Sequence, residues 1–164
     1  MNPIEWLEQN ATGFSELTTL EREAITHFAL LWSFFEARLL NNSANSYAIL
    51  ALTHKWSSQG CLDQTTFESS LQYFQQRYYP NNTESQYFSS LNLRNNDCPD
   101  LVKAVLKYDN QNQADRVAVL LIIVFRLRNN LFHGNKWADG IRGQLENFSH
   151  ANSTLMNALS MASL

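Results

Sequence analysis

The residues of this chain best suited to chemistry lie in one short run at positions 128–133, which reads RNNLFH. Arg128 opens the run and His133 closes it. Arginine offers a planar fork of N–H donors to two phosphate oxygens, and histidine exchanges protons near neutral pH. Between them, Asn129 and Asn130 can hydrogen-bond a phosphate or a sugar. This combination of residue types suits proton transfer and charge stabilisation at a phosphate group.

Helix geometry decides whether Arg128 and His133 can meet on one chain. Residues five apart on a straight α-helix differ by roughly 140° around the axis. The two side chains converge only if the helix ends or bends before His133, or if Arg128 reaches back along its long side chain. Gly134 favours such an ending and frees the backbone beside the imidazole. We therefore predict that the helix stops close to His133.

Positive side chains gather around the same run, although the chain as a whole is acidic. The net charge is −3 and the pI is near 5.8, which argues against a protein that coats nucleic acid with its entire surface. A local basic site is compatible with this balance. Only Asp139 opposes the positive candidates of this stretch, which are Arg126, Arg128, His133, Lys136 and Arg142.

The remaining histidines and the cysteines are weaker candidates. His27 is interpreted as a packing residue of a long helix, and His54 and His150 have no carboxylate or cysteine at ligand spacing. Cys61 and Cys98 lie far apart and form no metal-ligand cluster, so we expect two free thiols of a reducing cytoplasm. The sequence predicts neither a metal site nor a cofactor.

The helical spacing of apolar residues predicts the elements that must position the run. A short helix in the first dozen residues precedes a capping box at Thr18–Glu21 and a long amphipathic helix. The Asn- and Ser-rich segment from Asn81 to Pro99 is predicted to be a mobile loop. The strongest core helix carries Val117 to Leu127 and leads directly into the run. The other predicted helices lie at about 44–58, from Asp63 to Tyr78, at 100–108, and from Ile141 to Leu159.

These elements fit one domain over residues 1–164. Hydrophobic residues make up 45% of the chain and charged residues 16%, and only five glycines and three prolines interrupt it. We find no convincing strand, so the predicted fold is an all-α helical bundle of about five to six helices with antiparallel neighbours. The most apolar run, Val117 to Phe125, is about half the ~20 residues that a membrane span requires. No signal peptide is evident, and we expect a cytoplasmic protein without a membrane partner.

The run at 128–134, RNNLFHG, resembles the signature of the HEPN superfamily. That signature is an arginine and a histidine separated by four residues, with a polar residue after the arginine. The resemblance is confined to this heptad and gains weight from its place after a core helix in an all-helical chain. It implies a small helical bundle. Many members are metal-independent ribonucleases of toxin–antitoxin, phage-defence and RNA-processing systems.

The resemblance assigns roles to individual residues. Arg128 matches the motif arginine, Asn129 the polar residue beside it, and His133 the motif histidine, and these three are the predicted catalytic residues. Several members place a tyrosine two residues after the histidine, where this chain has Asn135. A subfamily controlled by modification of that tyrosine is therefore an unsuitable match. The predicted RNA-contacting residues around the site are Asn130, Lys136, Arg126 and Arg142.

These residue types can cleave RNA without a metal because RNA carries its own nucleophile, the 2′-hydroxyl. Cleavage then requires proton transfer by an imidazole and stabilisation of phosphate charge by a guanidinium. The expected products are a 2′,3′-cyclic phosphate and a free 5′-hydroxyl. Since one chain offers one histidine here, a two-fold homodimer would supply the second. Family members typically build their site this way. The expected partners are RNA, a second copy of the chain, and a cognate antitoxin or regulatory protein.

Two other interpretations stay open at this point. A chain with this fold and motif can serve as a non-catalytic module that binds RNA, nucleotides or a protein partner. A helical adaptor without a ligand would make Arg128 and His133 ordinary capping or surface residues. An RNA assay separates the three interpretations: a nuclease cleaves RNA, a binding module retains RNA without cleaving it, and an adaptor does neither.

Overall fold

Helices make up the fold of this protein. The computed structural model describes residues 2–133 and 141–161. In these two ranges the chain forms seven α-helices and no strand, so the predicted all-α class is confirmed, with slightly more than the expected five to six helices. The α-helices are α1 (Pro3–Asn10), α2 (Thr19–Leu39), α3 (Ser46–Ser58), α4 (Glu68–Tyr78), α5 (Pro99–Leu106), α6 (Gln113–Phe132) and α8 (Leu145–Met161), joined in part by short 3-10 helices η1 (Phe14–Glu16), η2 (Gln64–Phe67), η3 (Pro80–Asn82), η4 (Phe88–Leu91) and η5 (Asn95–Asp97).

The capping box predicted at the start of α2 is confirmed. The Glu21 backbone N–H donates to the Thr18 hydroxyl at 3.2 Å, and the Thr18 N–H donates to the Glu21 carboxylate at 2.9 Å. The hydrogen bond from the Thr18 backbone is the main reason that the pKa of Glu21 lies below its ordinary value. These contacts satisfy backbone donors that the helix itself leaves unpaired, so α2 begins at Thr19.

Helix α6 is the centre of the core. Every side chain from Val117 to Val124 is at most 2% exposed, as its continuous apolar sequence predicts. Helix α3 packs on α6 in the antiparallel sense. His54, near the end of α3, bonds Asp115 at the start of α6, while Ser46 at the start of α3 bonds Asp97 beside the later turns of α6. No helix within the two described ranges is both long enough and apolar enough to cross a membrane.

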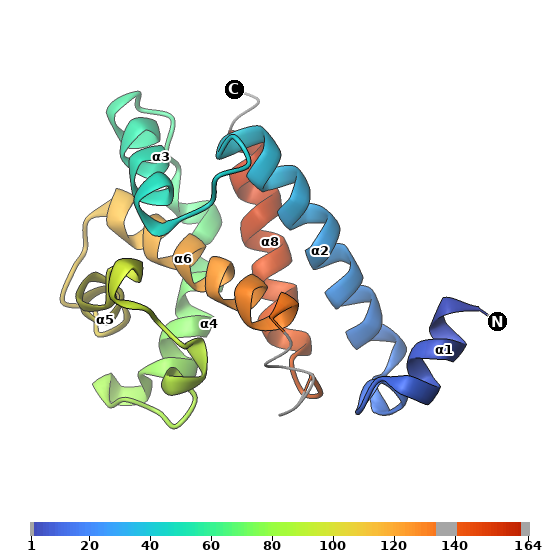
Figure 1. The fold of residues 1–164 in the computed structure, drawn as a ribbon. Coiled ribbons are helices and arrows are strands. Elements are labelled where there is room, and N and C mark those ends of the chain that lie inside the picture. The colour runs from blue at the N-terminus through green and yellow to red at the C-terminus, as the bar shows by residue number, and fades with distance from the viewer. Residues whose placement is uncertain (1, 134–140, 162–164) are drawn as a thin grey trace.

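Helices α2 and α8 lie side by side and run in the same direction (Figure 1). Their starting ends meet where the Gly143 N–H donates to the Glu21 carboxylate at 2.8 Å. Farther along, the rings of Phe28 and Phe148 are 5.1 Å apart. The expected antiparallel packing therefore holds for α3 with α6 but is wrong for α2 with α8. The reason is that Arg142 and Gly143, just before α8, contact Glu16 and Glu21 at the start of α2, so α8 begins at that end.

The segment from Asn81 to Cys98, most of the predicted 81–99 loop, contains three 3-10 helices and is packed against α6. Its 3-10 helices bury Phe88 and Leu91 among the core side chains. The Arg126 Nε also donates to the Leu91 carbonyl at 3.1 Å. The sequence did not predict these buried contacts, because the segment is rich in Asn and Ser and its apolar residues are few and widely spaced.

Candidate active site at the end of α6

Helix α6 ends at Phe132, close to the predicted place, with His133 as its C-cap. The His133 N–H still donates to the Asn129 carbonyl at 2.9 Å, and the residue has φ −86° and ψ 10°. His133 therefore keeps its helical position around the axis, roughly 140° from Arg128. The helix ending alone does not bring the two side chains together on one chain.

The Arg128 side chain is partly buried and held on several sides. Its guanidinium carbon lies 5.4 Å from the centre of the Phe132 ring and 5.9 Å from that of the Trp32 ring. Its Nη2 is 3.8 Å from a Glu36 carboxylate oxygen. Each cation–π contact of this kind contributes about 0.5–1 kcal/mol. The guanidinium reaches along α6 toward Phe132, the neighbour of His133.

Glu36 and Trp32 on α2 form the support beneath this guanidinium. The Trp32 indole N–H donates to one Glu36 oxygen at 2.8 Å, and the Ala44 backbone N–H donates to the other at 3.3 Å. The Trp32 ring also stacks on Phe125 of α6, with centroids 5.8 Å apart. Sequence reasoning assigned no site role to Glu36. The sequence feature that could have indicated a role for Glu36 is its position one helical turn after Trp32.

Asn129 positions Arg128 and is too buried to meet a substrate freely. Its side-chain oxygen accepts a hydrogen bond from Arg128 Nη1 at 3.0 Å, and the residue is only 5% exposed. The guanidinium Nε of Arg128 is buried and has no hydrogen-bond partner within the described residues. Asn129 thus fixes one edge of the arginine fork, and the predicted direct contact with phosphate or 2′-hydroxyl does not fit its burial.

His133 is exposed at the helix end. In the described part of the chain its imidazole takes part in no hydrogen bond or ion pair, and only its backbone N–H is engaged. An imidazole in this setting is accessible to a substrate and able to accept or donate a proton. The structure thus places a held guanidinium and an accessible imidazole at the same end of α6, roughly 140° apart around its axis.

Two predicted RNA contacts prove to be structural. Arg126 is 3% exposed, with its Nη1 3.3 Å from an Asp97 oxygen, and burial lowers the pKa of its guanidinium. Asn130 is 1% exposed, and its side-chain amide donates to the carbonyls of Ser90 and Leu91 at 2.9 and 3.3 Å. An RNA-contacting role is wrong for both residues, because their polar groups face the 81–98 segment rather than solvent.

The other two predicted RNA contacts have different outcomes. Arg142 is exposed, and its Nη1 pairs with a carboxylate oxygen of Glu16, which offsets much of the positive charge it would offer a phosphate. Lys136 lies outside the described residues, as do Gly134 and Asn135. Of the predicted catalytic and RNA-contacting residues that are described, Arg128, His133 and Arg142 therefore keep access to solvent.

Among the other histidines, His27 differs from expectation. His27 is exposed, so its interpretation as a packing residue is wrong. His54 does meet a carboxylate, since its Nε2 is 2.9 Å from Asp115 Oδ1. That pairing links α3 to α6, and the sequence could not predict it because the two residues lie far apart in the chain. His150 lies 4.0 Å from Glu146 and stacks on a tyrosine ring.

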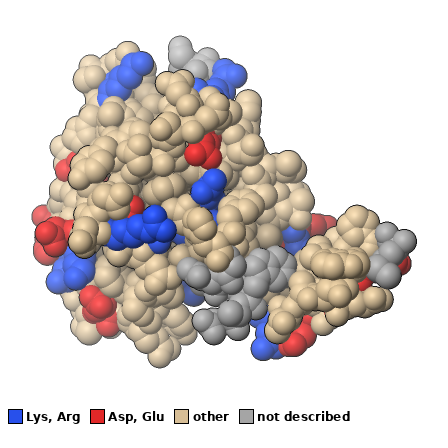
Figure 2. All heavy atoms as spheres, in the orientation of Figure 1, with Lys and Arg blue, Asp and Glu red and all other residues tan. Residues whose placement is uncertain are grey.

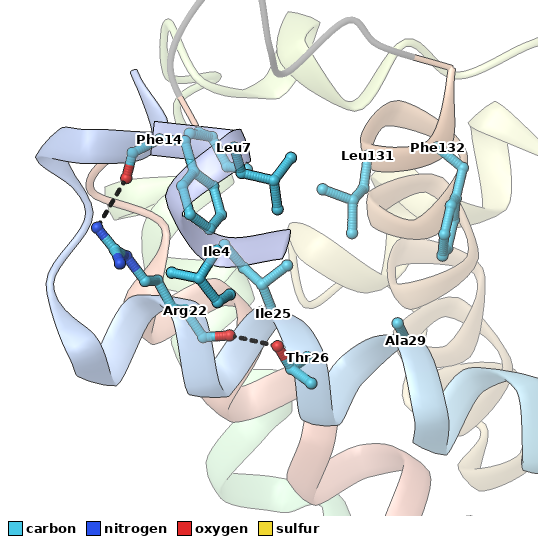
Figure 3. A pocket seen from close by; sticks show the side chains of 10 residues that line it. Ile4, Leu7, Phe14, Arg22, Ile25, Thr26, Ala29, Leu131 and Phe132 are labelled. Carbon is cyan, nitrogen blue, oxygen red and sulfur yellow. Dashed lines mark hydrogen bonds between the residues drawn. The ribbon is translucent and has the colours of Figure 1, made fainter. Parts of the chain in front are cut away.

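An apolar pocket of about 390 Å³ lies beside the candidate site. Figure 3 shows Ile4 and Leu7 of α1 on one side and Leu131 and Phe132 of α6 on the other, with α2 forming the floor. Phe132 therefore borders both this pocket and the Arg128 guanidinium. The ring is 56% exposed, so it is one of several large apolar side chains in the described residues that are more than half exposed.

Exposed apolar side chains continue along α2. Leu30 and Phe34, one turn apart, are 66% and 54% exposed. Leu30 directly follows Ala29, which lines the pocket together with Phe132. We refer to Leu30, Phe34 and Phe132 as the α2–α6 apolar face. On the face drawn in Figure 2, lysines and arginines form separate small groups, several beside acidic residues, with no continuous basic area.

In the described ranges, no three His, Cys, Asp or Glu side chains cluster so that they could hold a metal ion. No known family model matches this chain, and no significant similarity links it to a curated protein or a solved structure. The HEPN resemblance therefore rests on the residues of the 128–134 run.

Proposed function

We propose that this protein is a metal-independent endoribonuclease of HEPN type, which cleaves RNA at the interface of a homodimer. The observation that carries the proposal is the pairing of a held guanidinium with an accessible imidazole at the end of one core helix. Trp32, Phe132 and Asn129 hold Arg128 in place, while His133 is exposed and its ring is unengaged in the described part of the chain. Preorganised charge of this kind is what a phosphoryl transition state requires.

The reaction follows from these groups. The imidazole of one His133 takes the proton of the 2′-hydroxyl, and the 2′-oxygen attacks the adjacent phosphorus. The bond from phosphorus to the 5′-oxygen breaks, and the imidazolium of the second His133 gives its proton to that leaving oxygen. Arg128 stabilises the added negative charge on the non-bridging oxygens. The products are a 2′,3′-cyclic phosphate and a 5′-hydroxyl.

The α2–α6 apolar face supports the dimeric arrangement. Its side chains are more than half exposed, and Phe132 contacts Arg128, so a second copy that covers Phe132 would bring its own 128–133 run close to this one. A two-fold axis there would also overcome the angular separation of Arg128 and His133, since the arginine of one copy can face the histidine of the other. The biological setting proposed with this activity is a toxin–antitoxin or phage-defence system.

One observation favours a second candidate, an RNA-binding module that does not cleave. Arg128 already contacts Glu36 and Asn129 within its own chain, which leaves fewer donors for a phosphate. An arginine engaged in this way can contribute to binding without stabilising a transition state. This module would share the homodimer and the RNA partner of the leading proposal.

A cleavage assay on purified protein in excess chelator separates the two functions. We expect the wild-type protein to cut a fluorescent single-stranded RNA, and His133→Ala to lower the rate by about 10²–10⁴-fold, the usual contribution of a general acid or base. His27→Ala is the matched control, because that histidine is also exposed and lies elsewhere. The control should cut at the wild-type rate.

The same preparation is examined for its oligomeric state by light scattering. If His133→Ala cleaves RNA at the wild-type rate, His133 is not a catalytic residue and this site is not the active site. RNA binding without cleavage by the wild-type protein would establish the non-catalytic module instead.

A further inference from the structure

A second pocket of about 390 Å³ differs in character from the apolar one beside Phe132. It lies between the 3-10 helix η4 and the start of α5, elements that lie close together in Figure 1. Its polar lining residues are Glu84, Ser89, Asn92 and Lys103, and its apolar walls come from Phe88, Leu93 and Pro99.

The polar groups of this pocket include one cation and several acceptors. The Lys103 ammonium lies 5.7 Å from the Phe88 ring centre, and no ion pair of this lysine exists in the described parts of the chain. One Glu84 oxygen accepts from the Tyr79 hydroxyl at 2.7 Å, and its second oxygen has no hydrogen-bond partner among the described residues. Asn92 has a backbone φ of 50°. The nitrogen of its side-chain amide donates to Asn130, so the side-chain oxygen remains as an acceptor.

The pocket is joined directly to the 128–133 run. The Asn92 amide donates to the Asn130 side-chain oxygen at 3.3 Å, and Asn130 also binds the carbonyls of Ser90 and Leu91. Around the α6 axis, Asn130 lies roughly 60° from His133 and roughly 160° from Arg128. A nucleotide held in this pocket would therefore lie on the side of α6 nearer to His133.

We propose that this pocket is a nucleotide subsite for single-stranded RNA that favours a base with an exocyclic amino group. Lys103 contacts a phosphate, and the Glu84 and Asn92 oxygens accept hydrogen bonds from the amino group. Uracil presents a carbonyl oxygen at the corresponding position and would face these acceptors unpaired. Phe88, Leu93 and Pro99 enclose the unstacked base, a common mode of single-strand recognition. The inference rests on the proposed function for the identity of the polymer.

Binding measurements in a cleavage-deficient background test the subsite. His133→Ala protein is titrated into fluorescent oligocytidine and oligouridine of about 12 nucleotides, a length within the range of single-strand sites, and anisotropy is recorded in chelator. We expect oligocytidine to bind roughly fivefold or more tightly than oligouridine, the lower limit for one good base-edge contact. Adding Glu84→Gln should reduce this preference, because the new amide can donate to the uracil oxygen.

Two lysines of α5 give a matched charge comparison. Lys103 lines the pocket, whereas Lys107 lies 5.5 Å from the Tyr79 ring and outside the lining. Lys103→Gln should weaken binding about five- to tenfold and lower the salt dependence by nearly one counterion, and Lys107→Gln should change affinity less than twofold. Equal weakening by the two substitutions, or equal binding of the two homopolymers, would overturn the subsite.

Failure of the subsite and failure of the proposed function give different results. If wild-type protein cuts RNA in chelator but Lys103→Gln and Lys107→Gln bind alike, the nuclease stands and the subsite is wrong. If Lys103→Gln alone weakens binding and no RNA is cut, the subsite stands and catalysis is wrong. Asn92→Gly tolerates the positive φ and removes the acceptor, so it should also reduce the preference for oligocytidine.

Discussion

Two histidines of this chain occupy opposite environments, and the difference separates a chemical role from a structural one. His133 is exposed at the end of α6, with its ring unengaged in the described residues. His150 stacks on Tyr73 with centroids 4.2 Å apart, and its Nδ1 lies 3.2 Å from the Ser70 hydroxyl. Burial lowers the pKa of His150, while Glu146 acts in the opposite direction. His150 is therefore a packing residue that resists protonation.

This environment predicts a pH dependence of stability. Because the folded chain binds a proton at His150 less readily than the unfolded chain does, stability is complete above the unfolded pKa of about 6.5 and falls as the pH drops below it. His150→Phe can keep the ring stacking but cannot titrate. Urea unfolding at pH 8 and pH 5.5 should show a larger loss of unfolding free energy in the wild-type protein than in this variant. An equal loss in the two proteins would contradict the assignment.

At the scale of elements, α6 joins the core, the 81–98 segment and the candidate site. The sequence predicted this helix and its end well, because continuous apolar residues and a following glycine are strong local signals. It did not predict which polar residues of α6 turn inward. Arg126 and Asn130 look like binding residues in the sequence, and their partners Asp97 and Leu91 are more than 25 positions away. Contacts that depend on tertiary packing leave no periodic pattern in the chain.

The buried Arg126–Asp97 pair should be essential to the attachment of the 81–98 segment. Arg126→Ala leaves the Asp97 carboxylate buried without its cation, although Ser46 and the Arg94 backbone still donate to it. We expect a loss of about 3–5 kcal/mol in unfolding free energy, measured by urea denaturation. The double variant with Asp97→Asn should lose clearly less than the sum of the two single variants. Strict additivity would show that the pair does not act as a unit.

At the scale of the whole molecule, α2 and α8 run in parallel (Figure 1), and several large apolar side chains of α2 are exposed in the described part of the chain. Leu30 and Phe34 are among them, and they lie on a different side of α2 from Trp32 and Glu36, which support Arg128. The hydrophobic periodicity predicted a long amphipathic α2, but it could not show that some apolar residues would remain outside the core. Such residues are what an interface between copies of the chain requires.

The dimer proposal predicts a selective effect of Phe34→Asp. An exposed aromatic that becomes buried between copies often contributes about 2 kcal/mol, so the dimer dissociation constant should rise about 30-fold or more. Leu20→Asp is the matched control, since Leu20 is 62% exposed on the same helix but outside the α2–α6 apolar face. Analytical ultracentrifugation over a concentration series measures the dimer dissociation constant of each variant. Equal behaviour of the two variants would place the interface elsewhere.

The chemical ends of the RNA fragments made in excess chelator test the proposed catalysis most directly. Mass spectrometry of the fragments should find 2′,3′-cyclic phosphates and 5′-hydroxyls from the wild-type protein, and almost no fragments from His133→Ala. Fragments with 5′-phosphates, or the same cyclic-phosphate yield from His133→Ala, would contradict transesterification by the paired Arg128 and His133.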